Sequence, residues 1–372
     1  MSDNKCRDIV ENILSQGGIT INGDKPYDII VHDENFYKRA LDGSLGFGES
    51  YLAGWWDCQK LDELFFRILA YDVPSKIKID FKTIVKFIEC KVVNNQSRGK
   101  AKIVGEKHYD IGNELFEKML DKRMTYSCGY WKDAKTLDEA QEAKLELICR
   151  KLDLKSGMKV LDIGCGWGSF AKYAAEKYDV NVTGVTISKQ QVELGKELCK
   201  GLPVDIRLQD YRDIGESFDR VVSVGMFEHV GRKNYKTFMK VANRCLKDDG
   251  LVLLHTIGTN ITHDVIDPWT NKYIFPNGML PSIKDIGQSM EGLFVMEDWH
   301  NFSAYYDKTL LEWHKNFNDN YDLLKDKYDE RFFRMWNYYI LSCAGAFRAR
   351  CNQLWQIVLS KRGILGGYES IR

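Results

Sequence analysis

The chain has 372 residues, of which 44% are hydrophobic, and its 53 basic and 53 acidic residues give a formal net charge of zero. This hydrophobic content excludes a largely disordered chain, and the balanced charge gives no sign of a protein that binds nucleic acid. The length suits one large domain together with a smaller one.

The cysteines and the N-terminal sequence indicate the compartment. No apolar run reaches the length of about 18 residues that a transmembrane helix needs. The first residues, MSDNKCRDIVEN, lack the apolar core of a signal peptide. We therefore expect a cytoplasmic protein whose ten cysteines are free thiols. They form no CxxC pair, so we expect no metal site.

Residues 1–93 are predicted to form a mostly helical N-terminal domain, with a short strand at 27–31 and a helix at 62–70. In residues 76–93 the apolar side chains fall on one helical face, and residues 76–107 carry nine Lys/Arg against three acids. Such a helix is more often part of a core with its basic face in water. The alternative is a helix that lies on an anionic membrane surface. Residues 94–107 indicate a polar linker.

Residues 108–372 alternate between strand and helix patterns and are predicted to form an α/β domain. A polar-entry helix is expected at 108–121, and an amphipathic helix at 137–154 leads to the first strand. Alternation of this kind favours a doubly wound, mainly parallel sheet. A helical, aromatic-rich insertion at about 303–350 is expected to cover the active site. The expected strands lie at 160–162, 181–188, 204–210, 218–230, 250–258, 294–302 and 354–361.

A glycine-rich turn follows the first of these strands, in the sequence DIGCGWG at 162–168. Glycine lets the backbone approach a ligand closely, and the helix that follows offers free N–H groups. The spacing is G-x-G-x-G instead of the G-x-G-x-x-G of dinucleotide folds, and Asp162 precedes the first glycine. An acid beside the loop favours a cationic ligand such as S-adenosylmethionine. The alternative is a tight turn without a ligand.

Ten segments of the chain, in order, resemble the cyclopropane-fatty-acyl-phospholipid synthases and their mycolic acid cyclopropane synthase relatives. The segments are HYDIGN, TYSCGYW, VLDIGCGWGSFA, GVTIS, QDYRD, VGMFEHVG, HTIG, NKYIFPNG, EDWHNF and CAGAFRARCNQLWQ. The resemblance implies a Rossmann-like class I S-adenosylmethionine-dependent methyltransferase domain with a mainly parallel seven-stranded sheet. It also implies a smaller helical N-terminal domain for lipid binding and dimerisation, which the mycolic branch lacks.

The resemblance further implies a reaction. A methylene group passes from S-adenosylmethionine to the cis double bond of unsaturated acyl chains of membrane phospholipids, and bound bicarbonate deprotonates the carbocation. It implies a homodimer that docks transiently on the inner face of the cell membrane and binds no nucleic acid. One alternative is a fatty acyl C-methyltransferase that gives methyl-branched products, where reduction or water quenches the cation. Another is a membrane-binding scaffold with a vestigial cofactor fold.

The resemblance also assigns residues, although each of them alone fits an ordinary structural role. The catalytic residues are Cys128, Glu228, His255 and Tyr306, and with the Ile257 N–H they are the expected bicarbonate ligands. Thr186 and Gln191 stand where the wider fold has an acid for the ribose hydroxyls. The expected cofactor-binding residues are Tyr126, Ser127, Asp162, Gly164, Gly166, Thr186, Gln191, Asp210, Tyr211 and Arg212.

Overall fold

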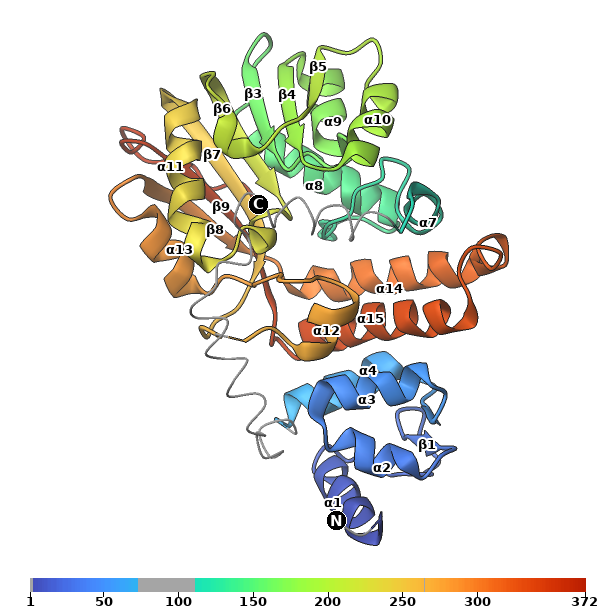
Figure 1. The fold of residues 1–372 in the computed structure, drawn as a ribbon. Helices are drawn as coiled ribbons and strands as arrows, with labels where there is room; N and C mark the ends of the chain where they lie inside the picture. The colour runs from blue at the N-terminus through green and yellow to red at the C-terminus, as the bar shows by residue number, and fades with distance from the viewer. Residues whose placement is uncertain (1–2, 73–110, 264) are drawn as a thin grey trace. The chain divides into compact units, whose positions relative to one another are not determined.

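The computed structural model describes residues 3–72, 111–263 and 265–372 (Figure 1). The described chain divides into two compact units. Unit 1 takes the described residues within 1–94, 263–276 and 306–352, and unit 2 takes those within 95–262, 277–305 and 353–372. The helix expected at 76–93 and the linker at 94–107 lie outside the described residues. The domain boundaries at 1–93, 94–107 and 108–372 therefore stay a prediction.

Unit 1 is mostly helical. The strand expected at 27–31 shortens to a two-residue antiparallel pairing, because the buried Asp28 carboxylate accepts the N–H groups of Thr20 and Lys25 and holds the preceding residues in a turn. The elements are α1 (Asp3–Ser15), β1 (Ile30–Val31), α2 (Asn35–Ala40), α3 (Gly43–Leu52), β2 (Trp56–Asp57), α4 (Leu61–Ala70), α12 (Pro268–Tyr273), most of α14 (Ala304–Asp319), and α15 (Glu330–Arg348).

Close packing of α15 on α4 joins distant parts of the sequence within unit 1. A β-carbon at Gly345 of α15 would lie 2.7 Å from the backbone oxygen of Asp62, so only glycine fits at this crossing. One turn further on, Arg348 donates to Asp62 at 2.7 Å and to Asp307 of α14 at 3.0 Å. The helices of residues 306–352 therefore form one body with α4.

Unit 2 is built on a seven-stranded sheet with the order β5-β4-β3-β6-β7-β9-β8. The first five strands are mutually parallel, and β9 runs antiparallel to both β7 and β8. The mainly parallel seven-stranded sheet expected from the sequence is therefore confirmed. The strands are β3 (Lys159–Ile163), β4 (Asn181–Thr186), β5 (Val204–Leu208), β6 (Phe218–Val224), β7 (Leu246–Gly258), β8 (Val295–Asn301) and β9 (Gln353–Ser360).

Helices cover both faces of this sheet (Figure 1). On one face α8 (Leu137–Lys151) and α9 (Ser169–Tyr178) pack on the sheet, and on the other α11 (Tyr235–Cys245) and α13 (Ile283–Met290) do so. The remaining helices are α7 (Asn113–Met119) and α10 (Lys189–Leu198). Ser188 caps α10 through the N–H of Gln191, as its sequence position predicts.

The sheet order places a topological switch between β3 and β6, because the chain runs outward from β3 to β5 on one side and from β6 to β7 on the other. In open α/β sheets, ligands bind beyond the carboxyl ends of the strands at such a switch. Among the described residues, no helix is long and apolar enough to cross a bilayer, and no disulfide joins the cysteines.

Candidate active site

The glycine loop after β3 adopts a backbone that L-residues rarely take. The φ angles of Gly164, Gly166 and Gly168 are +83°, +56° and +84°. A β-carbon at Gly164 would lie 2.5 Å from the Met226 side chain, whereas one at Gly166 would meet no atom within 4 Å. The loop therefore packs tightly on the segment after β6 and leaves open space beside Gly166, which fits a bound ligand.

Three of the expected cofactor residues surround this loop. Asp162, at the end of β3, is 2% exposed, and its burial raises the pKa of the carboxyl group to about 7 although the nearby Lys144 lowers it. At the end of β4, the Thr186 hydroxyl donates to the side-chain oxygen of Gln191 at 2.7 Å. The two residues predicted to replace the ribose-binding acid thus lie in contact with each other.

Asp210, Tyr211 and Arg212 form a compact group beyond the end of β5. The Asp210 carboxylate accepts from the backbone N–H of Arg212 at 3.0 Å and from its Nε at 2.8 Å. The guanidinium carbon lies 5.4 Å from the centre of the Tyr211 ring. The hydrogen bond to the Asp210 carboxylate raises the pKa of the Arg212 guanidinium, which therefore stays protonated.

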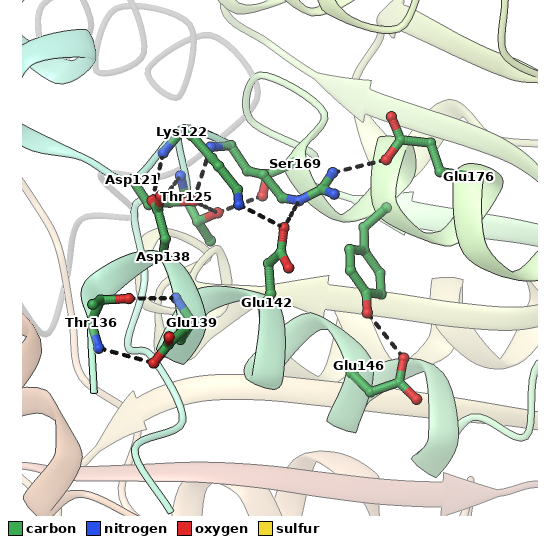
Figure 2. A network of polar contacts seen from close by, with 12 residues as sticks. Asp121, Lys122, Thr125, Thr136, Asp138, Glu139, Glu142, Glu146, Ser169 and Glu176 are labelled. Atoms are coloured by element: carbon green, nitrogen blue, oxygen red, sulfur yellow. Dashed lines mark hydrogen bonds and ion pairs between the residues drawn. The ribbon is translucent and has the colours of Figure 1, made fainter. Parts of the chain in front are cut away.

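Residues 121–128 form a segment that is held against α8 and α9. Asp121 accepts the Thr125 N–H at 2.8 Å, and the Thr125 hydroxyl lies 2.6 Å from that of Ser169, the first residue of α9 (Figure 2). The Tyr126 ring packs edge-on against Phe116 of α7, with 5.1 Å between ring centres. This anchoring fixes the backbone that carries Tyr126 and Ser127.

Glu228 lies in the short helical turn Phe227–His229 that follows β6, and His255 lies within the neighbouring strand β7. His255 pairs in register with Val224, the last residue of β6. Glu228 Oε1 accepts the N–H of Ile257 at 2.6 Å, whereas Glu228 Oε2 and His255 Nε2 are buried without a described partner. Burial raises the pKa of Glu228 to about 7, although the Ile257 N–H opposes this. The two orphaned atoms mark a place for a polar ligand.

Gln356 of β9 lies against His255. Its side-chain nitrogen is 3.3 Å from His255 Nδ1, and in this orientation of the amide its N–H donates to Nδ1, which leaves the ring proton on Nε2. Burial, together with the positive charges of Lys144 and Lys151, lowers the pKa of His255 well below its usual value. Gln356 reaches this ring because β9 runs beside β7.

The two remaining predicted ligands lie in different units. Cys128 is fully buried in unit 2, and its Sγ lies 3.2 Å from the Gly129 carbonyl oxygen. Tyr306 belongs to unit 1, where its ring stacks on Phe347 at 4.4 Å between ring centres. The approach of Tyr306 to Glu228 and His255 therefore stays a prediction.

Sequence reasoning missed two residues at this edge of unit 2, Gln356 and Lys144. Lys144 of α8 is fully buried, and its Nζ donates to the Ser127 hydroxyl at 2.7 Å. The sequence does contain a signal for each residue. Lys144 stands on the apolar face of a predicted helix, between Gln141 and Ile148, and Gln356 interrupts the apolar strand LWQIVL. Both patterns are unusual, because such side chains are mostly exposed.

A mainly parallel seven-stranded sheet, with β9 antiparallel between β7 and β8 and a G-x-G-x-G loop after the first parallel strand, defines the class I S-adenosylmethionine-dependent methyltransferase fold. The solved structure of mycolic acid cyclopropane synthase CmaA1 complexed with SAH and CTAB is 34% identical with a TM-score of 0.65. The match between the two covers 70% of this chain and 98% of the CmaA1 chain.

Two curated relatives and a family profile agree with this fold. Residues 96–357 match the family described as mycolic acid cyclopropane synthetase. The chain is 54% identical to the cyclopropane-fatty-acyl-phospholipid synthase of Escherichia coli over 365 residues, 98% of this chain and 95% of the relative. It is 38% identical to a probable fatty acid methyltransferase of Pseudomonas putida over 272 residues, 68% of each chain. The chain therefore belongs to the cyclopropane synthase family of S-adenosylmethionine-dependent methyltransferases.

The raised pKa of Glu228 predicts a pH-dependent loss of stability. The ordinary pKa of the carboxyl group is 4.5, and its pKa in the folded protein is about 7. At pH values between these two, Glu228 keeps a proton in the folded protein that it releases in the unfolded chain. Stability therefore falls as pH rises through this range. The free energy of unfolding of the parent, minus that of Glu228→Gln, should drop by about 2 to 3 kcal/mol between pH 5 and pH 8.

Denaturant titrations at several pH values measure this difference. Glu216→Gln is the control, because the Arg207 hydrogen bond lowers the pKa of Glu216 and leaves it ionised throughout this range. Its difference should be flat. A flat difference for Glu228→Gln as well would mean that Glu228 is ionised in the folded protein.

Proposed function

We propose that the protein transfers a methylene group from S-adenosylmethionine to the cis double bond of unsaturated acyl chains of membrane phospholipids, which forms cyclopropane fatty acids. The identity with the Escherichia coli synthase over nearly the whole chain supports this substrate class. The observation that carries the proposal is a pair of buried, unpartnered atoms: Glu228 Oε2, in the turn after β6, and His255 Nε2, on the neighbouring strand β7.

The cofactor-binding role falls to the residues around the glycine loop. Bound S-adenosylmethionine supplies the electrophilic methyl group and leaves as S-adenosylhomocysteine. Gly164 and Gly166 allow the backbone to approach it, and Asp162 provides an acceptor for its positive end. The hydroxyl and amide groups of Thr186 and Gln191 replace a carboxylate at the ribose. The other members of the proposed set are Tyr126, Ser127, Asp210, Tyr211 and Arg212.

The site is suited to an anion because its protein groups are neutral hydrogen-bond donors near positive charge. His255 is uncharged and offers Nε2–H, and Glu228, with its pKa at about 7, can offer an O–H. Lys144 and Lys151 add positive charge nearby. Bound bicarbonate would supply the base that accepts the proton from the methylated acyl chain. A weak base suffices there, because the adjacent carbocation makes the methyl group acidic.

Cys128, Tyr306 and the Ile257 N–H complete the proposed bicarbonate ligands. The Ile257 N–H donates to Glu228 in this structure, so contact with the anion requires that bond to be shared or exchanged. Proton loss and ring closure are coupled. As the base removes a proton from the transferred methyl group, the two electrons of the broken C–H bond form the second C–C bond of the ring.

Aromatic side chains next to His255 would stabilise the carbocation and exclude water from it. Phe302 lies 5.8 Å from the His255 ring, and Tyr130 packs edge-on against both Phe302 and Tyr305. Each aromatic face contributes about 0.5–2 kcal/mol to a nearby cation. Exclusion of water matters because water would trap the cation as an alcohol.

A fatty acyl C-methyltransferase with methyl-branched products is the second candidate. The 38% identity to a probable fatty acid methyltransferase of Pseudomonas putida favours it. For either activity we propose a cytoplasmic homodimer that docks transiently on the membrane surface. The sequence candidate for docking is the basic amphipathic segment 76–93, extended by Arg98, Lys100 and Lys102.

The mass of the lipid product separates the two activities. Unsaturated phospholipid vesicles incubated with the protein and labelled S-adenosylmethionine should yield acyl chains that are heavier by one CH2. Quenching of the cation by reduction or by water would instead add CH4 or CH4O. Mass analysis of the extracted lipids that finds only the latter products would overturn cyclopropanation in favour of methyl branching.

The proposed bicarbonate ligands should act on turnover and not on the cofactor. We expect Glu228→Gln and His255→Ala to lower turnover at least 100-fold, because they hold the base. Their affinity for S-adenosylhomocysteine, measured by calorimetry, should stay within about threefold of the parent. Equal loss of turnover and cofactor affinity in both variants would place these residues at the cofactor instead.

The open space beside Gly166 predicts the opposite effect, a loss of cofactor affinity. Gly166→Ala should reduce affinity for S-adenosylhomocysteine at least tenfold, because its β-carbon enters that space. Gly157→Ala is a matched control, since Gly157 also has a positive φ, +80°, and an open surrounding, but lies in the turn before β3. Both variants carry similar backbone strain. Equal cofactor affinity in the two would mean that the loop is only a turn.

A further inference from the structure

Lys144 is a buried cation without a carboxylate beside it. Its side chain on α8 is 0% exposed, and its Nζ donates to Ser127 Oγ at 2.7 Å. Within the described residues, no carboxylate oxygen lies within 4.0 Å of this ammonium group. A buried charge is costly unless a partner compensates it. The serine hydroxyl is a weak partner, so the site is suited to receive a negative charge.

Ser127 is held in a position from which its hydroxyl can link Lys144 to a ligand by hydrogen bonds. Gln141, one turn before Lys144 on α8, donates its side-chain N–H to the Ser127 carbonyl at 2.7 Å, which fixes the backbone. The Ser127 hydroxyl accepts from Lys144, so its own hydrogen remains to be donated elsewhere. Hydrogen bonds assisted by a charge are about twice as strong as neutral ones.

Asp162 presents the complementary charge. Its carboxyl group is 2% exposed and has no ion pair with any described residue; burial raises its pKa to about 7, although the nearby Lys144 lowers it. The two groups thus lie close to each other without meeting. Such a separated pair matches an α-amino acid, whose carboxylate and ammonium stand on one carbon atom.

We propose that Lys144, acting through Ser127, is the positioning residue for the α-carboxylate at the amino-acid end of the cofactor, while Asp162 accepts the adjacent ammonium group. The inference rests on the cofactor role proposed for Ser127 and Asp162. It depends neither on bicarbonate nor on the acyl substrate.

The affinity for S-adenosylhomocysteine should then depend on the charge of Lys144. Burial lowers the pKa of Lys144 to about 8, so the ammonium is lost as pH rises through 8 and affinity falls with it. The other ionisable groups facing it are Asp121, Cys128, Asp162 and His255. These groups are present in both parent and variant, so the ratio of their affinities reports the loss of Lys144 together with the change that its charge causes in the pKa of Asp162 and His255.

The test is calorimetry with S-adenosylhomocysteine on the parent and Lys144→Met. We expect at least a tenfold loss at pH 7 that shrinks toward pH 9. The decarboxylated analogue, which keeps the amine, should bind parent and variant equally. Ser127→Ala should lose affinity too, and the double variant should lose no more than Lys144→Met alone, because both act on one contact.

Lys151→Met is the matched control. Lys151 is the other fully buried lysine of α8, its pKa is also lowered to about 8 by burial, and it pairs with Asp298 at 3.5 Å. Its removal should leave the affinity and its pH dependence unchanged. If Lys144→Met fails to fold, the affinity for S-adenosylhomocysteine is measured against pH for the parent and for Lys151→Met. An affinity that does not fall between pH 7 and 9 overturns the inference.

Two further outcomes overturn it. One is an affinity of Lys144→Met within twofold of the parent, and the other is an equal loss for the decarboxylated analogue. If the parent itself binds no S-adenosylhomocysteine, the proposed cofactor site fails and this inference fails with it. If the parent binds normally and Lys144→Met binds equally well, only this inference fails.

Discussion

Desolvation at one edge of the parallel sheet is the constraint on which the chemistry of this protein depends. Burial raises the pKa of Asp162 and Glu228 to about 7 and lowers that of Lys144 to about 8. His255 is kept neutral by the same effect. These groups are therefore not fixed charges at neutral pH. Their protonation can follow the charge of a bound ligand, which suits the proposed site for a cationic cofactor and a bicarbonate base.

The sheet could be predicted from the sequence because its signals are local. Each parallel strand is a short apolar run followed by a turn, and the glycine loop at 164–168 stands where the first strand gives way to a helix. The short strand β1 was overestimated, since the Asp28 carboxylate holds the residues before it in a turn. Membership of 306–352 in unit 1 depends on Gly345 and Arg348 meeting α4, which no local pattern reveals.

Some residues of the candidate site could likewise be predicted from the sequence and others could not. Asp162, Glu228 and His255 follow or end strands in recognisable motifs, so the sequence locates them on the carboxyl edge of the sheet. Gln356 and Lys144 act through burial against distant segments, and burial of a polar side chain follows from tertiary packing. The contact of Gln356 with His255 could not be predicted for this reason, because Gln356 lies on β9, 101 residues later in the chain.

The order in which the ribosome delivers these elements has a consequence for biogenesis. Helix α15 completes unit 1 by packing on α4, and β9 completes unit 2 by inserting between β7 and β8. Both lie within residues 330–360. Until this stretch leaves the exit tunnel, α4 lacks its partner and β7 and β8 expose unpaired edges in the middle of the future sheet. Such nascent chains present strand edges and apolar surface to chaperones. A single late segment thus commits both halves of the protein to the native state.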